Sequence, residues 1–210
     1  RSRELSAAAA LVVMLLAASV LIGWRAGIAV LTSAVPGLVP MNPVTALNFL
    51  LAALSLQCFH ARRRRPGLLL PGRLLAFAVA LVAGLAVSRL ITPWDLGPDR
   101  LLFPSRIAHA VAGFPNRMAP NTAASFVLLG LALFLLPSVR AGWRRTGRVA
   151  AALSGLAACV VVLGYIYGSR SLYAVGGLIP MAINTAGAFV IMSAATQIGR
   201  ASCREKCRSG

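Results

Sequence analysis

Residues 118–127 read MAPNTAASFV, and the same pattern occurs at 41–50 (MNPVTALNFL) and at 181–190 (MAINTAGAFV). In each copy Thr follows the Met by four residues, Phe follows it by eight, and a small residue follows it by twelve. Because residues four apart lie on one face of a helix, each copy predicts the same stripe along a helix. The stripe positions are Met41, Thr45, Phe49 and Ala53, then Met118, Thr122, Phe126 and Gly130, and finally Met181, Thr185, Phe189 and Ser193.

Each copy opens one of six long apolar segments. A helix needs about 20 apolar residues to cross a bilayer core of about 30 Å, and all six are near that length. None of them contains Asp or Glu, and Arg89, near one end, is the only Arg inside any of them. Long apolar runs without alternating polar residues favour helices over barrel strands. The segments lie near 6–24, 44–59, 74–91, 121–139, 149–167 and 178–196.

The composition excludes several classes of protein. Of the 210 residues 59% are apolar and 12% are charged, and the mean hydropathy is +0.81. Soluble domains carry about 25% charged residues, so a water-soluble enzyme is disfavoured, and so much apolar surface also excludes intrinsic disorder. A net charge of +17 is typical of nucleic-acid binding. Here the arginines lie between apolar runs of membrane length, and we expect no nucleic-acid partner.

The arginines predict the orientation of the chain in the membrane. Counted by loop, more of them fall on the side that holds both chain ends, and the positive-inside rule places that side in the cytoplasm. Trp24, Trp94, Tyr165 and Tyr167 fall at the opposite ends of helices, where aromatic rings favour the lipid–water interface. The cytoplasmic arginines are Arg1, Arg3, Arg62 to Arg65, Arg73, Arg140, Arg144, Arg145 and Arg148, and the others are Arg25, Arg89, Arg100, Arg106, Arg117 and Arg170.

Together these patterns predict an all-α polytopic membrane protein. Three copies of a helix pair, at about 5–60, 73–139 and 148–196, indicate parallel repeats related by an axis along the membrane normal. We expect six transmembrane helices, arranged as three repeated helix hairpins around a pseudo-threefold axis. The second, fourth and sixth helices would turn their stripes toward that axis.

The two ends of the chain look unlike the rest. The chain begins with Arg1 rather than Met, and residues 197–210 form an abruptly polar stretch, QIGRASCREKCRSG. We interpret 197–210 as a sequencing-adapter artefact and 1–196 as the native module of a truncated protein. A basic juxtamembrane tail and a Cys-x-x-x-Cys metal half-site are the alternatives. Cys58 and Cys159 lie in apolar runs and imply no disulfide framework.

The polar and thioether ends of the three stripes are the candidate ligand-binding residues. Thioethers at one depth could hold a soft ion such as Cu(I) or Ag(I), although Met also fills irregular gaps in cores, and packing is the preferred interpretation. Polar groups in lipid usually have a partner or a purpose. The candidates are Met41, Thr45, Met118, Asn121, Thr122, Met181, Asn184 and Thr185, with Asn42 as a plausible helix cap.

Two further candidates lie in loops. His109, in the long outer loop, could titrate near neutral pH and sense external pH, or it could simply be exposed. Arg62, Arg63, Arg64 and Arg65 form a basic run at the inner face. Such a run attracts anionic lipid by about 1 kcal/mol per charge.

The repeated motif resembles a known membrane region. The stretches RMAPNTAASFVLLGLALFLL and GGLIPMAINTAGAFVI are similar to the six-helix region found ahead of PAS, histidine-kinase or diguanylate-cyclase domains in bacterial signalling proteins, and the resemblance covers about 11–196. The architecture is also similar to the MHYT sensor domain. Its His-Tyr part is absent here, so the copper coordination proposed for that family does not transfer. Val44 stands where the other copies have Asn121 and Asn184.

The resemblance implies a sensory input module in the bacterial cytoplasmic membrane, with both termini cytoplasmic. It would respond to an unknown small ligand or membrane signal and pass the response through the sixth helix to a missing output domain. On the resemblance alone we expect a homodimer, the parent protein being a histidine kinase or diguanylate cyclase. We also expect no cofactor and, because the spans lack acidic residues, no enzymatic activity in this fragment. The alternative is a small transporter or channel-like protein, which the absence of Asp, Glu and His from mid-span positions disfavours.

Overall fold

The computed structural model describes residues 2–33, 38–62, 65–88, 102, 117–169 and 179–205, with side chains of the last helix described to Ile198. All regular secondary structure in these ranges is helical, which confirms the all-α part of the predicted fold class. The elements are α1 (Ser2–Ala26), α2 (Ala29–Thr32), α3 (Pro43–Ala61), the 3₁₀ turn η1 (Pro66–Leu68), α4 (Leu69–Ser88), α6 (Pro120–Leu135), α7 (Ala141–Ile166) and α9 (Ile183–Glu205).

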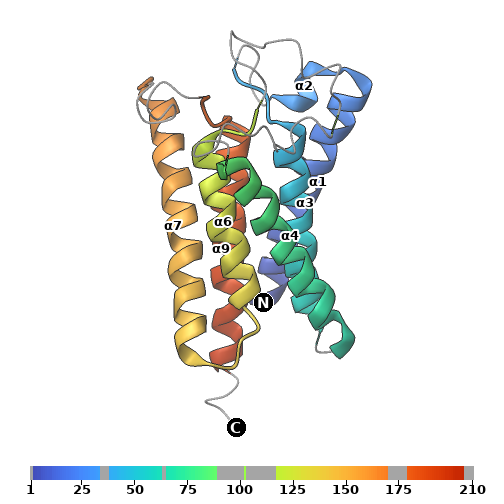
Figure 1. Cartoon of the computed structure of the whole chain (residues 1–210), viewed down its shortest axis with the longest axis vertical. Helices are drawn as coiled ribbons and strands as arrows, with labels where there is room; N and C mark the ends of the chain where they lie inside the picture. Colours follow the sequence, from blue (N-terminus) through green and yellow to red (C-terminus); the bar gives the residue numbers. More distant parts are fainter. Residues whose placement is uncertain are drawn as a thin grey trace.

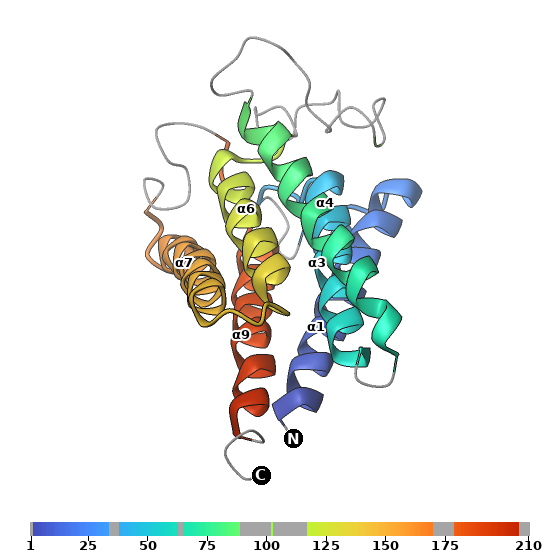
Figure 2. The ribbon, with the colours of Figure 1, turned by 60° about the horizontal axis from the view of Figure 1, so that its bottom comes forward.

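The six long helices of the described chain form a closed ring of contacts (Figures 1 and 2). The cyclic order is α1, α3, α4, α6, α7, α9 and back to α1. The helices α3, α6 and α9 also contact one another, so they are the inner helices, and α1, α4 and α7 are the outer helices. Each outer helix therefore packs into the groove between two inner helices.

Neighbouring helices in the ring run in opposite directions. The outer helices begin, and the inner helices end, at the end of the bundle where the chain enters α1 and leaves α9 (Figure 2). We call this end the basic end, because Arg62, Arg65, Arg73 and the arginines of 140–148 lie there. The inner helices begin at the opposite end.

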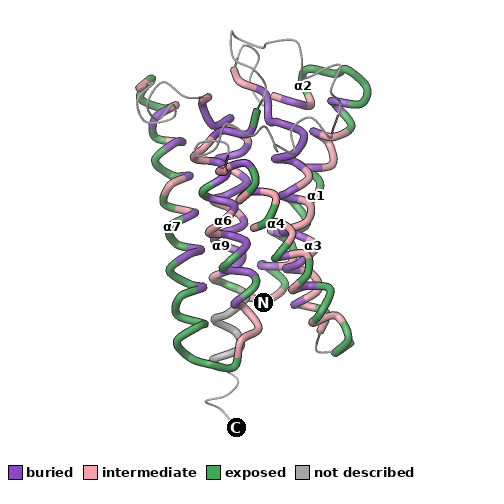
Figure 3. Tube along the Cα trace, viewed as in Figure 1, coloured by how far each residue is buried: buried purple, intermediate pink, exposed green. Residues whose placement is uncertain are grey.

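Apolar side chains are exposed mainly on the outer helices (Figure 3). Leu15 on α1, Leu74 on α4 and Leu156 on α7 are 63%, 58% and 62% exposed. Among the described residues, four helical stretches are long and apolar enough to cross a membrane, namely Ser2–Ala26, Pro43–Ala61, Pro66–Ser88 and Ala141–Ile166. Pro120–Leu135 and Ile183–Ile198 are shorter apolar helices. An apolar perimeter of this kind indicates a membrane-embedded protein.

Prolines explain where two helices depart from the sequence-based bounds. The fourth apolar segment was expected to run to 139, but α6 ends at Leu135, with Leu136 as its C-cap. Pro137 follows, and a proline has no backbone N–H with which to continue the hydrogen bonds of the helix. The sixth segment was expected to begin at 178, but α9 begins at Ile183, after the non-helical residues 179–182, which include Pro180. The fifth helix, α7, instead begins at Ala141, before the apolar run.

Candidate functional site

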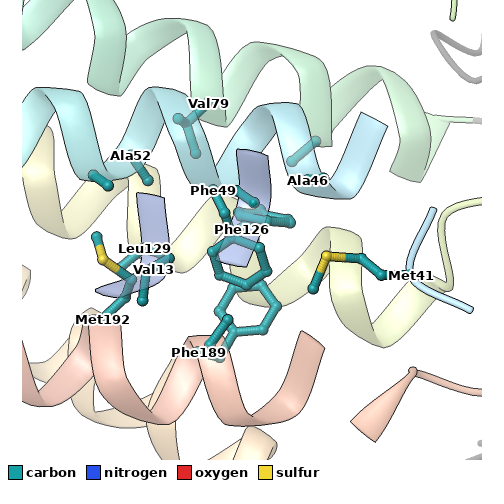
Figure 4. Close-up of a cluster of buried hydrophobic side chains, with 14 of the residues drawn as sticks. Val13, Met41, Ala46, Phe49, Ala52, Val79, Phe126, Leu129, Phe189 and Met192 are labelled. Carbon is teal, nitrogen blue, oxygen red and sulfur yellow. The ribbon is translucent and has the colours of Figure 1, made fainter. Parts of the chain in front are cut away.

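Three phenylalanines meet at the centre of the bundle (Figure 4). Phe49, Phe126 and Phe189 come from the three inner helices and are fully buried. Their ring centroids lie 4.6, 4.7 and 4.5 Å apart, with interplanar angles of 58°, 63° and 59°. Tilted and edge-to-face pairs at this separation are favourable aromatic geometry. The Phe of each copy therefore faces inward, as the sequence predicts, whereas the small residues Gly130 and Ser193 face the outer helices α4 and α7.

The methionines and threonines of the motif are also buried. Met41, Met118 and Met181 are 0%, 6% and 1% exposed, and all three belong to the same hydrophobic core as the phenylalanines. Each Met comes before the helix that carries its Phe, so the methionines lie toward the end opposite the basic end. Thr45, Thr122 and Thr185 are 2%, 3% and 2% exposed. We call these six side chains the Met–Thr ring.

Asparagines order the first turn of each inner helix. The Oδ1 of Asn42 accepts hydrogen bonds from the backbone N–H groups of Val44 and Thr45 at 2.8 and 3.4 Å, so Asn42 is the N-cap that the sequence predicts. Asn121 and Asn184 instead accept from the N–H of the following Thr, at 2.9 and 3.1 Å. The two asparagines thus occupy equivalent positions with the same backbone bond, and Asn184 also donates from Nδ2 to the Thr32 carbonyl at 3.3 Å.

Two aromatic residues hold the start of inner helices through backbone carbonyls. Trp24 was expected at the lipid–water interface, but it is only 8% exposed, and its Nε1–H donates to the Met41 carbonyl at 2.8 Å. The Tyr165 hydroxyl donates to the Met181 carbonyl, also at 2.8 Å. A buried indole N–H needs an acceptor, and the carbonyl before the helix supplies one. The aromatic residue precedes its Met by 17 residues in one copy and by 16 in the other, so no common spacing in the sequence marked this pairing.

The small residues of the motif mark places where helices approach closely. A Cβ on Gly130 would lie 2.8 Å from the backbone nitrogen of Ala80, so α6 lies directly against α4. A Cβ on Gly155 would lie 2.9 Å from the Cβ of Ser193, where α7 meets α9. Close approach of backbones at small residues is how helices associate in lipid.

A buried asparagine beside the aromatic cluster was missed in the sequence. Asn48, fully buried, donates from Nδ2 to the Val79 carbonyl at 3.4 Å, while its Oδ1 has no hydrogen-bond partner among the described residues. The other copies have Ser125 and Ala188 at this position. Comparing the three copies at every position, rather than only at the shared ones, would have identified it.

Polar bonds between helices gather toward the basic end. The Ser6 hydroxyl donates to the Ala195 carbonyl at 2.6 Å and lies 3.0 Å from His60 Nε2. Because the hydroxyl has one hydrogen, this pairing assigns a proton to Nε2, which donates to Ser6. Gln57 donates to the Ala7 carbonyl at 2.9 Å and Gln197 to the Arg148 carbonyl at 2.8 Å, at equivalent positions of two copies.

Several sequence candidates lie outside the described residues. They include His109, Arg63, Arg64 and Trp94. Arg62 and Arg65 are described, and Arg62 is the C-cap of α3. Among the described residues no group of His, Cys, Asp or Glu side chains could hold a metal ion. Soft-ion binding by the three methionines stays a prediction.

The Met–Thr ring places thioethers and hydroxyls between the aromatic cluster and the end of the bundle opposite the basic end, with Asn121 and Asn184 beside the threonines. Ligand binding by these residues stays a prediction. No protein family, no curated protein and no solved structure matches the chain.

Proposed function

We propose that this chain is the membrane-embedded sensory input module of a bacterial signal-transduction protein, in which all six long helices cross the membrane. The proposed architecture is three helix pairs around a pseudo-threefold axis that passes through the aromatic cluster. Two features support it. Inner and outer helices alternate around the ring, and the centroids of the three phenylalanine rings are nearly equidistant.

In the proposed orientation the basic end faces the cytoplasm of a bacterium, at its inner membrane. The excess of arginine at that end supports this, since positive residues are retained on the cytoplasmic side. The Met–Thr ring then lies toward the outside. Cysteine labelling tests the orientation. A thiol introduced at Arg145 should react with an impermeant maleimide only in inverted vesicles, and one introduced at Ile28 only in right-side-out vesicles.

The observation that carries the proposal is the position of α9. Met181 precedes this helix, Thr185 lies in its first turn, and the helix runs to the basic end. There it is bonded to α1 through Ser6 and to α7 through Gln197. A ligand or membrane change that favours one packing of the ring would shift the position of α9, and so act on an output domain that follows it.

The aromatic cluster disfavours the alternative of a transporter or channel. A path along the axis would have to pass three rings whose centroids are less than 5 Å apart. Transporters also carry broken helices near the midplane, and the six described long helices are continuous. A conducting protein of this fold would need a large rearrangement of its core.

A fusion experiment tests the proposal. Residues 1–196 are joined by a short helix to a diguanylate-cyclase domain, and cyclic di-GMP is measured in cells. Replacing buried Thr122 by Val should change the output several-fold, because it removes a hydroxyl from the ring with almost no change in volume. Replacing Leu156, exposed on α7, by Ala is the matched control and should leave the output unchanged.

Two outcomes would contradict the sensory role. One is an output that stays constant across ring variants that insert and fold normally. The other is release of an ion gradient by the unmodified chain in proteoliposomes, which would favour the channel-like alternative. The gene itself gives a further check, since a PAS, kinase or cyclase domain should follow Thr196 within a short helix.

A further inference from the structure

The first two turns of α7 extend beyond the apolar run of that helix. The helix begins at Ala141, whereas the apolar residues begin at Val149. Eight helical residues add about 12 Å to the length of the helix. A bilayer core of about 30 Å is flanked by headgroup layers that bring the total to about 40–45 Å, so these two turns reach through one headgroup layer.

This part of α7 is exposed and strongly basic. All residues of 140–146 are exposed, and Trp143 is 51% exposed on the helix surface. The described stretch 138–150 contains no acidic residue. Its arginines are Arg140, Arg144, Arg145 and Arg148, all exposed.

One of these arginines is held in place by the preceding loop. Arg144 donates through Nη1 to the carbonyls of Val139 and Ser138, at 2.5 and 3.4 Å. These bonds tie the first turns of α7 to the loop that joins it to α6. Arg145 and Arg148 follow on the same exposed turns.

Little negative charge from the chain is available to these residues. The sequence has four acidic residues, and the only one whose side chain the structure describes is Glu4, in the first turn of α1. The helices that pack on α7 are α6 and α9. Neither α6 nor α9 up to Gln197 carries an acid, and Glu205, later on α9, is accompanied by Arg200 and Arg204.

We infer that the surface formed by Arg140, Trp143, Arg145 and Arg148 binds the headgroups of anionic phospholipids. The guanidinium groups match phosphate oxygens in charge and in hydrogen-bond geometry. A tryptophan at headgroup level places its ring among the upper acyl chains and its N–H in the polar layer. This surface lies at the start of α7, far along the chain from the basic run 62–65, and the inference does not depend on the sensory role.

Trp143 itself can report the binding. The full chain is reconstituted in phosphatidylcholine vesicles in which a tenth of the lipid is brominated near the headgroup, either as phosphatidylglycerol or as phosphatidylcholine. Subtracting the signal of Trp143→Phe isolates Trp143 from the other tryptophans. We expect brominated phosphatidylglycerol to quench Trp143 at least about twofold more than brominated phosphatidylcholine, because the anionic lipid is enriched beside it.

Charge variants distinguish lipid binding at this surface from a general attraction of anionic lipid to a positively charged protein. Arg145→Gln with Arg148→Gln should abolish the excess quenching, whereas Arg25→Gln, at the other end of the bundle, should leave it intact. Circular dichroism and gel filtration confirm that each variant is folded. Equal quenching by the two lipids, or an excess that survives the double variant, would overturn the inference. So would loss of the excess on adding millimolar inorganic phosphate, because the surface would then bind a soluble anion.

Discussion

The three central phenylalanines are the residues on which the packing of the inner helices depends. Each ring contacts the other two, so removing one leaves the remaining pair beside a void. When a transmembrane helix separates from its neighbours, a buried phenylalanine moves into lipid rather than into water. Its burial between helices therefore contributes almost no hydrophobic transfer energy to stability. What remains is the loss of packing around the void.

For Phe126→Ala we therefore expect a loss of about 2 kcal/mol in the free energy of unfolding, from a void cost of about 24 cal/mol per Å³. The control is Phe77→Ala, because Phe77 is 55% exposed on the outer face of α4 and should cost far less. Unfolding in mixed micelles measures both. Equal losses in the two variants would show that the cluster is no better packed than the perimeter.

Ser6 is a second residue with a distinct energetic role, since it bonds to both α3 and α9. Ser6→Ala should cost about 1–2 kcal/mol, because two interhelical hydrogen bonds are lost. Ser19→Ala is a matched control on the same helix, where the hydroxyl bonds only to the Leu16 carbonyl of its own turn. Both variants are unfolded in the same denaturant titration. Equal destabilisation by Ser19→Ala and Ser6→Ala would contradict a stabilising role for the interhelical bonds of Ser6.

At the scale of the helices, close approach at glycine decides which pairs can form. Gly130→Ala should destabilise the protein by about 1–3 kcal/mol, since the new methyl group meets the backbone of α4 at Ala80. Gly84 on α4 has open space around it, so Gly84→Ala should be neutral or should stabilise by up to about 1 kcal/mol. Thermal unfolding of the pair measures the difference, and a harmless Gly130→Ala would contradict the packing of α6 on α4.

The sequence predicted helices and their inward stripes well, because both follow from short-range periodicity. The spacing of Phe49, Phe126 and Phe189 from the Met and Thr of each copy was enough to predict that they point inward. The pairing of Trp24 with the Met41 carbonyl could not be predicted, because an aromatic residue at a helix end is equally compatible with lipid and with a backbone acceptor. Whether the Oδ1 of Asn48 has a hydrogen-bond partner depends on which helix packs opposite, and periodicity carries no such information. Among the described residues it has none.

At the scale of the whole molecule, ring closure joins the first and last helices. Ser6→Cys and Ala195→Cys, in a chain without its other cysteines, should cross-link rapidly with a short bifunctional thiol reagent. Ala132 occupies the equivalent position on α6 and packs with Ala150 and Ala151 of α7, so Ser6→Cys with Ala132→Cys should not cross-link. Shifted mobility on gels reports the product, and cross-linking of both pairs would mean that α1 is not confined between α3 and α9.

The bond between Ser6 and Ala195 joins residues 189 positions apart, and this separation has a consequence for biogenesis. A ribosome adds about 5–20 residues each second, so the first helix resides in the bilayer for on the order of ten seconds or more before its last neighbour is synthesised. During that interval one flank of α1 is covered by lipid or by the insertion machinery. The helix α9 then completes the circle, so the ring of six helices closes only after α9 has been synthesised.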